Sequence, residues 1–253
     1  MSYYNVKQWT TAIADAIRAK EESSDPIFHQ DFPDRISNLQ TGYTVGDVIR
    51  GDLGSNLVLD GVINRVSPEM FIGNLEIVSV DGEDVYELAE SVFDGCSSLE
   101  TIDFPNLKYI GEYAFNNTSS LTEAEFPSAE NIRSRAFYNS GLERIVIGSE
   151  GVSTTLYNLV LGECRNLTTC EIYETSAIPN EFFLNCENLE TLIIRNAYDV
   201  PSLASSALNG CLKLGSYQGG IYVDDNLVNS YKNATNWSLY GPIIFPISDL
   251  GGA

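Results

Sequence analysis

The feature that most constrains the fold is a short pattern that returns seven times between Val66 and Gly219. In each copy an aliphatic residue is followed, five positions later, by an aromatic residue or leucine. The pairs are Val66 with Phe71, Leu88 with Phe93, Ile110 with Phe115, Ile132 with Phe137, Leu156 with Leu161, Ile178 with Phe183 and Leu203 with Leu208. Successive copies lie 22 to 25 residues apart, a period typical of solenoids. The chain is therefore predicted to be a repeat protein.

Each copy also predicts one short strand followed by a return arm. A leucine follows the aromatic position, at Leu75, Leu99, Leu121, Leu142, Leu167, Leu189 and Leu214. Two strand sites lie three and five residues beyond it, as in Ile102 and Phe104; in the last copy Tyr217 and Gly219 occupy them. Alternation over so short a window predicts a strand with a fixed inward face. Because such a unit cannot bury its apolar edge alone, successive strands are expected to stack about 4.8 Å apart.

Two stretches carry a family resemblance. VFDGCSSLETIDFPNLKYIGEYAF (92–115) and FFLNCENLETLIIRN (182–196) resemble the BspA-type leucine-rich repeat. Its cysteine position, three residues after the aromatic one, holds Cys96, Cys164, Cys186 and Cys211, whereas the third and fourth copies carry Thr118 and Ser140 near it. The resemblance spans most of residues 66–219 and implies an α/β-type leucine-rich repeat solenoid of about seven repeats, one short strand each. We interpret the cysteines as a buried column of small, free thiols.

Four regions are expected: a helical segment at 1–41, adaptor strands at 42–64, the solenoid at 65–219 and a helical cap at 220–253. Trp9, Ile13 and Ile17 fall on one face of a predicted amphipathic helix. That helix either caps the solenoid or serves attachment or oligomerisation. Residues 12–39, AIADAIRAKEESSDPIFHQDFPDRISNL, resemble an N-terminal segment of tail-associated proteins of phages and prophages of Gram-positive gut bacteria. This implies other virion or tail proteins as partners.

The C-terminal region predicts a last strand and a closing helix. Ile221 and Val223 are expected in the strand, and Asp224 or Asp225 at the start of the helix. Trp237, Tyr240 and Ile243 are then expected to cover the open end of the core. The stretch IYVDDNLVNSYKNATNWSLYGPIIFPIS (221–248) resembles the closing segment of BspA-type proteins of gut Firmicutes and their phages.

Charge and composition argue against several function classes. The chain has 14 Lys and Arg against 35 Asp and Glu, a formal charge of −21, so nucleic acid would be repelled. No stretch of about 18 apolar residues and no secretory leader is visible, so we expect no membrane insertion. No cofactor motif occurs. Acidic stretches at 81–84 and 224–226 lack the spacing of an EF-hand loop, and we expect no metal site.

Catalytic residues are not predicted. His29 is the only histidine, and no G-x-S-x-G sequence accompanies it, which argues against a nucleophilic triad. Asp103, Glu125 and Glu171 are expected on one face, and glycoside hydrolysis needs two such acids. An open sheet face gives little desolvation to raise a pKa. We therefore expect a protein that is not an enzyme. A polysaccharide depolymerase that uses paired carboxylates is the alternative.

The outward residues of the predicted strands are the candidate ligand-binding set: Thr101, Asp103, Glu123, Glu125, Arg144, Thr169, Glu171, Tyr173, Thr191 and Arg195. The return arms at 108–113 and 130–135 are equally exposed and stay open as a second surface. Repeat folds serve as binders because outward residues vary without disturbing the core. We expect recognition of a bacterial surface glycan or protein by a phage tail protein, located in a virion assembled in the host cytoplasm. The alternative is a bacterial cell-surface adhesin whose leader was removed.

Overall fold

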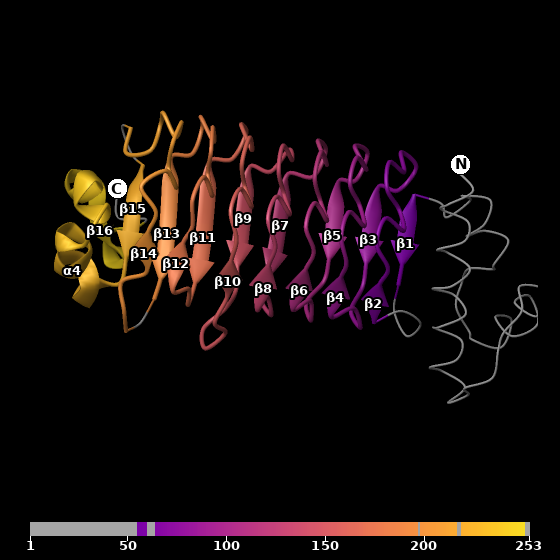
Figure 1. The fold of residues 1–253 in the computed structure, drawn as a ribbon, viewed down its shortest axis with the longest axis horizontal. Helices are drawn as coiled ribbons and strands as arrows, with labels where there is room; N and C mark the ends of the chain where they lie inside the picture. The colour runs from indigo at the N-terminus through magenta and orange to yellow at the C-terminus, as the bar shows by residue number, and fades with distance from the viewer. Residues whose placement is uncertain (1–54, 60–63, 197, 217–218, 251–253) are drawn as a thin grey trace, which may run out of the picture.

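The computed structural model describes residues 55–59, 64–196, 198–216 and 219–250. These residues form an elongated slab in which one turn of chain stacks on the next, with short helices at the C-terminal end (Figure 1). Trp9, Ile13, Ile17 and His29, and the helix predicted within 1–41, lie outside the described residues. Of the predicted adaptor at 42–64, the structure describes 55–59 and 64.

The main ladder of the slab is a row of parallel strands. It begins with β1 (Asn56–Val58), β3 (Ser79–Asp81), β5 (Thr101–Asp103) and β7 (Glu123–Phe126). It continues with β9 (Arg144–Ile147), β11 (Thr169–Tyr173), β13 (Thr191–Arg195), β15 (Gly220–Val223) and β16 (Ile244–Pro246). β1, β3 and β5 form one hydrogen-bonded sheet. The second sheet consists of β7, β9, β11, β13, β15 and β16, and the two sheets follow each other along the slab (Figure 1).

A second ladder of two-residue strands runs beside the first (Figure 1). Its members are β2 (Arg65–Val66), β4 (Glu87–Leu88), β6 (Tyr109–Ile110), β8 (Asn131–Ile132), β10 (Thr155–Leu156), β12 (Ala177–Ile178) and β14 (Ser202–Leu203). The buried second residue of each is the aliphatic residue that defines the repeat. Each repeat therefore has two strands, and the prediction of a single strand was wrong.

Helix is confined to the C-terminal end among the described residues. The helical elements are η2 (Asp225–Leu227), α4 (Val228–Asn233), η3 (Trp237–Ile243) and η4 (Ile247–Asp249). The return arms of the described repeats are turns and short strands, so the solenoid is mostly sheet and the predicted α/β class does not describe it. The described residues contain no helix with the length and apolar character needed to cross a membrane.

Both ends of the ladder differ from the prediction. Strand β1 falls within the adaptor strands predicted at 42–64 and joins the ladder directly, because Leu57 pairs with Val80, which pairs with Ile102. In the next turn, Ile77 rather than Leu75 fills the leucine position: Leu75 is 62% exposed and Ile77 is fully buried.

At the other end, Ile221 and Val223 pair with Leu192 and Ile194 of β13. The predicted last strand is confirmed by this register. It also shows that Gly219 precedes the strand, so the assignment of a strand site to Gly219 was wrong; Tyr217 lies outside the described residues. The last repeat carries extra residues before its strand, and simple spacing from Leu214 could not reveal them.

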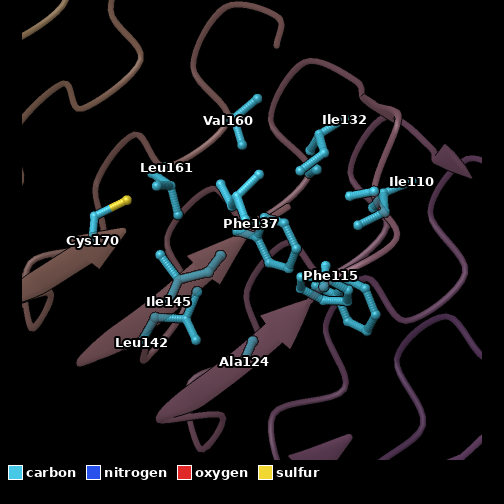
Figure 2. Close-up of a cluster of buried hydrophobic side chains, with 14 of the residues drawn as sticks. Ile110, Phe115, Ala124, Ile132, Phe137, Leu142, Ile145, Val160, Leu161 and Cys170 are labelled. Carbon is cyan, nitrogen blue, oxygen red and sulfur yellow. The ribbon is translucent and has the colours of Figure 1, made fainter. Parts of the chain in front are cut away.

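The core is a ladder of stacked rings. Phe71, Phe93, Phe115 and Phe137 stack in sequence, with centroid separations of 5.3, 5.5 and 5.3 Å. Phe126 tilts against Phe137 from the long strands at 5.3 Å. Figure 2 shows Phe115 and Phe137 enclosed by buried aliphatic residues of both ladders, including Ile110, Ile132 and Ile145. The column of aromatic residues predicted from the repeat is confirmed, with leucine at Leu161 and Leu208.

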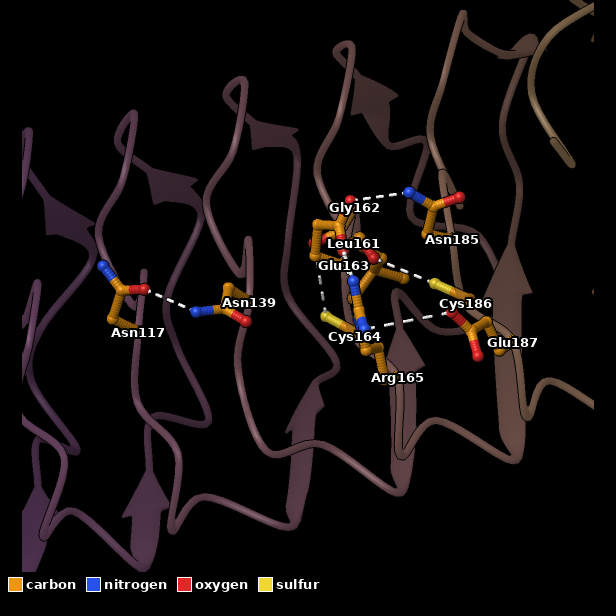
Figure 3. Close-up of polar contacts among 10 residues, drawn as sticks. All are labelled: Asn117, Asn139, Leu161, Gly162, Glu163, Cys164, Arg165, Asn185, Cys186 and Glu187. Carbon is orange, nitrogen blue, oxygen red and sulfur yellow. Dashed lines mark hydrogen bonds and ion pairs between the residues drawn. The ribbon is translucent and has the colours of Figure 1, made fainter. Parts of the chain in front are cut away.

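The cysteine column is polar as well as packed. The thiols of Cys96, Cys164 and Cys186 each donate to a buried carbonyl of the preceding repeat at 3.0 Å (Figure 3 shows Cys186). Thr118 occupies the same repeat position and donates to the carbonyl of Phe115 at 2.8 Å, and Ser140 lies 3.2 Å from the sulfur of Cys164. The position therefore selects a small hydrogen-bond donor, because an unpaired buried carbonyl is costly. Reading it as apolar was incomplete.

A left-handed residue precedes this position in every described copy. The residues are Gly73, Gly95, Asn117, Asn139, Glu163, Asn185 and Gly210, with φ between 54° and 83°. Glycine and asparagine suit this conformation best. Glu163 is the exception, and its carboxylate is held by Asn185 at 2.7 Å and by Arg165 at 2.9 Å (Figure 3).

The C-terminal segment closes the core. Tyr231 and Trp237 are fully buried with ring centroids 5.1 Å apart, and the indole of Trp237 donates to the carbonyl of Pro201 at 2.7 Å. Tyr240 and Ile243 are partly buried against the core, as expected. Asp224 is the N-cap residue of η2, the position predicted for it, but no side-chain cap bond forms, and Asp225 accepts the backbone N–H of Ser248. Pro246 lies in the edge strand β16.

Replacing Phe115 by alanine removes the ring stacked between Phe93 and Phe137. We expect a loss of roughly 3–5 kcal/mol in the free energy of unfolding, measured by urea denaturation. Phe115→Leu should cost less, because it keeps most of the volume. Tyr198→Ala is the control, since Tyr198 is 85% exposed. An equal loss from both alanine variants would contradict the ring ladder.

Thiol reactivity gives a second expectation. Burial raises the pKa of Cys96 to about 12 and of Cys164 to about 11, and it raises the pKa of Cys170 and Cys186 as well. Because the thiolate is the nucleophile, these four should resist a disulfide reagent at pH 8 in the folded protein and react once unfolded. Burial raises the pKa of Cys211 to about 12 as well, but among the five thiols only Cys211 is partly exposed, so it should be the first to react.

The same pKa shifts predict how the stability of the folded protein changes with pH. Each thiol has a folded-state pKa above its usual value of 9.0. The contribution of the neutral thiols to the stability of the fold is therefore fully present below pH 9. Stability should fall as the pH rises from 9 towards 11 and 12, because the unfolded chain ionises first. Fast labelling of several thiols in the folded protein at pH 8 would contradict the assignment.

Candidate binding face

The outward side chains of the long strands form rows across the main ladder. Backbone pairing places Glu123, Arg144, Thr169 and Thr191 in one row, and Thr101 holds the same position in β5. Asp103, Glu125 and Glu171 belong to the next row, and Tyr173 pairs with Arg195 in the third. The structure thus brings the ten predicted residues together on one face. Their role in binding stays a prediction.

The N-terminal half of this face is acidic and open. Asp103, Glu123 and Glu125 are exposed, and Arg144 is their neighbouring cation, with its Nη1 2.5 Å from the carboxylate of Glu125. The Glu125 carboxylate raises the pKa of Arg144. Asp103 and Glu125 lie on neighbouring strands but lack the burial by which an enzyme keeps a general acid protonated. Within the described ranges, no cluster of three or more His, Cys, Asp or Glu side chains is arranged to hold a metal ion.

The C-terminal half is more enclosed. Glu171 accepts a hydrogen bond and ion pair from Nε of Arg195, whose guanidinium lies 5.6 Å from the ring centroid of Tyr173. The side chains of Glu171 and Arg195 are 14% and 34% exposed. Burial raises the pKa of Asp224, and Asp225 adds to the increase, while the charge of Arg195 acts in the opposite direction. Arg195 therefore lies between two carboxylates and beside an aromatic ring.

Sequence reasoning missed two aromatic residues of this half. Tyr222 pairs with Ile193 in β13 and with Phe245 in β16, so the three side chains share the row of Glu171. The Tyr222 and Phe245 rings lie 5.7 Å apart with an interplanar angle of 39°. Ile193 points away from the core yet is only 5% exposed. The alternation of Ile221 and Val223 was a signal that could have placed Tyr222 on the outward face, whereas no repeat motif marks Phe245.

The second ladder presents the other surface considered from the sequence. Side chains in and directly before its strands pair with one another: Lys108 contacts Glu130 at 2.7 Å, and the hydroxyl of Tyr109 donates to the same carboxylate at 3.3 Å. Arg133 stacks over Tyr157 at 4.6 Å. These contacts link successive repeats.

The repeat geometry agrees with a comparison against family models. Residues 63–217 match the BspA type leucine rich repeat region, in six copies. The chain belongs to the BspA-type leucine-rich repeat family. A search of curated proteins found no match.

Solved structures of leucine-rich repeat proteins are similar to this one. A T. pallidum leucine-rich repeat protein aligns with a TM-score of 0.52 and 22% identity, covering 64% of this chain and 78% of that one. A leucine-rich repeat protein from Bacteroides ovatus aligns with a TM-score of 0.47 and 15% identity, covering 73% and 57%. At such identities, the likeness to the T. pallidum protein shows the fold alone.

The charges around Arg195 give a prediction for this face. Arg195→Gln should raise the pKa of Asp224 further, because it removes the positive charge that favours the ionised carboxylate. Carboxyl carbon NMR shifts, followed through a pH titration, measure this change. Arg144→Gln is the matched control, since Arg144 pairs with Glu125 on the same face. A fall in the pKa of Asp224 in the Arg195 variant would contradict the assigned interaction.

Proposed function

We propose that this protein is a non-enzymatic adhesion or binding module whose ligand, a bacterial surface glycan or protein, contacts the outward face of the main ladder. The observation that carries the proposal is the arrangement of ten outward side chains on one face of the main ladder, eight of them in register on the paired strands β7, β9, β11 and β13. Their backbone positions are fixed by hydrogen bonds between repeats, so the face is preorganised and loses little freedom on binding.

The setting we propose is the tail of a phage or prophage particle. Support comes from the resemblance of residues 12–39 to segments of tail-associated proteins. In this proposal Trp9, Ile13 and Ile17 contact other virion proteins or a second copy of the chain, and the solenoid meets the host surface. Display on a bacterial cell surface is the alternative setting, because repeats of this family are often found there.

A polysaccharide depolymerase is the competing class. Paired carboxylates would have to supply its chemistry, yet Asp103 and Glu125 are exposed and Glu171 is bound to Arg195. The geometry therefore favours binding. Release of reducing ends from capsule or cell-wall glycan by the purified chain would overturn this choice.

The test uses fluorescent full-length protein and a panel of intact Gram-positive gut bacteria, before and after removal of cell-wall glycans. Selected strains should bind. Thr169→Arg places a bulky cation at the centre of the face and should reduce binding by at least about tenfold. Asn131→Arg, at the first position of β8 in the second ladder, is the matched control and should bind normally.

The outcomes separate the parts of the proposal. Binding that is lost with the glycans identifies a glycan ligand, and binding that survives stripping identifies a protein. Equal binding by the Thr169 and Asn131 variants would overturn the choice of face. No binding to any strain would overturn recognition itself.

A further inference from the structure

The C-terminal third of the binding face carries a compact set of side chains that differs from the rest. This aromatic patch consists of Glu171, Tyr173, Ile193, Arg195, Tyr222 and Phe245. It spans the neighbouring strands β11, β13, β15 and β16, all joined in one hydrogen-bonded sheet. The patch combines adjacent rings, an aliphatic side chain and an ordered ion pair, whereas the N-terminal half of the face is dominated by exposed carboxylates.

The apolar part of the patch suits a flat, amphipathic ligand. Tyr222 and Phe245 stand on directly paired backbone positions with ring centroids 5.7 Å apart. Ile193 adjoins Tyr222 in the same row but is only 5% exposed, so the two rings supply the apolar contact area. A pyranose ring exposes a face of C–H groups that packs on such rings, while its hydroxyls point sideways. Aromatic side chains supply large contact area with few rotatable bonds.

The polar part lies beside these rings and is already ordered. Nε of Arg195 binds Glu171, and the guanidinium lies 5.6 Å from the ring centroid of Tyr173. A guanidinium has five N–H donors, so its bond to Glu171 leaves others for the ligand. The planar guanidinium and carboxylate present donors and acceptors at fixed spacing, which matches neighbouring hydroxyls of a sugar. Fixing them in the free protein reduces the entropic cost of binding.

Charge decides which glycan fits. The chain carries a formal charge of −21, and Asp103, Glu123 and Glu125 continue the same face with exposed carboxylates. Arg195, the cation of the patch, is flanked by Glu171 and lies within the electrostatic influence of Asp224. A polyanionic polymer would meet repulsion along this surface. A protein ligand would need a larger apolar contact than two partly exposed rings supply.

We propose that the aromatic patch is a subsite for an uncharged pyranose unit of a bacterial glycan, stacked on Tyr222 and Phe245 and hydrogen-bonded by Arg195 and Glu171. This inference rests on the proposed function and narrows it to one region and one ligand class. In this inference the outward residues of β5 and β7 lie outside the region that contacts the sugar.

The test measures binding of full-length protein to soluble polysaccharides by titration calorimetry. Dextran, mannan and galactan are the uncharged probes, and polygalacturonate is the anionic one. At least one uncharged probe should bind, and polygalacturonate should not. The double variant Tyr222→Leu/Phe245→Leu keeps apolar bulk in β15 and β16 while removing both rings. Its affinity should fall by at least about tenfold.

Two further variants keep the test decisive. Glu171→Gln removes the charge that orders Arg195 with little change of shape, and it should also weaken binding. Tyr109→Leu makes the same tyrosine-to-leucine change on the second ladder, where Tyr109 is 43% exposed, and it should bind like the unaltered chain. Circular dichroism melting checks that each variant is folded; if the double variant unfolds, Glu171→Gln decides alone.

The results distinguish this inference from the broader proposal. Unchanged affinity in the folded double variant, or in Glu171→Gln, overturns the subsite. Binding to polygalacturonate alone overturns the uncharged ligand class. If the protein binds intact cells but none of the uncharged probes, this inference is overturned and the proposed function stands. The same conclusion follows if protease treatment of the cells abolishes binding and glycan removal does not. Failure to bind either cells or polysaccharides overturns both.

Discussion

Backbone hydrogen bonds between successive repeats are the interaction on which the rest of this structure depends. The N–H of Ala89 donates to Val66, that of Gly111 to Leu88 and that of Arg133 to Ile110, at 3.1, 2.8 and 2.9 Å. Buried amides and carbonyls left without partners would each cost free energy comparable to a lost hydrogen bond. Each turn therefore requires a neighbour in register, and the aromatic column follows from that register, because rings at equivalent positions must lie one repeat apart.

This constraint separates the two sides of each long strand. Inward positions accept residues that fit the stack, such as Phe115 or the donor Cys164, since a change there disturbs two neighbours at once. Outward positions meet no such requirement, and there the chain carries acids at Asp103 and Glu125 but aromatic rings at Tyr222 and Phe245. A rigid scaffold with variable outward residues is the physical basis for assigning a binding role to this face.

The central repeats could be predicted from sequence because the register makes equivalent residues recur. Phe115, Phe137 and their strand sites appear at fixed spacing, and alternation then orients Thr169 and Glu171. The second ladder was missed because two-residue strands such as Tyr109–Ile110 are too short to show alternation. At the two ends of the ladder, where one neighbouring repeat is missing, the sequence pattern is less regular. Ile77 takes the place predicted for Leu75, and Phe245 lies on the outward face in a strand that follows a helical segment rather than a repeat.

Pro246 has a consequence for how such an array can lengthen. It lies in β16, the outermost strand of the described ladder, and proline offers no N–H to a further strand. Another protein or a copied repeat cannot continue the hydrogen bonding there without losing a hydrogen bond, so the chemistry of proline opposes extension of the ladder at this edge. Differences in the number of repeats among related solenoids are then expected to arise by duplication or deletion of whole interior repeats. Such events would shift the aromatic patch relative to the N-terminal end while leaving its own geometry intact.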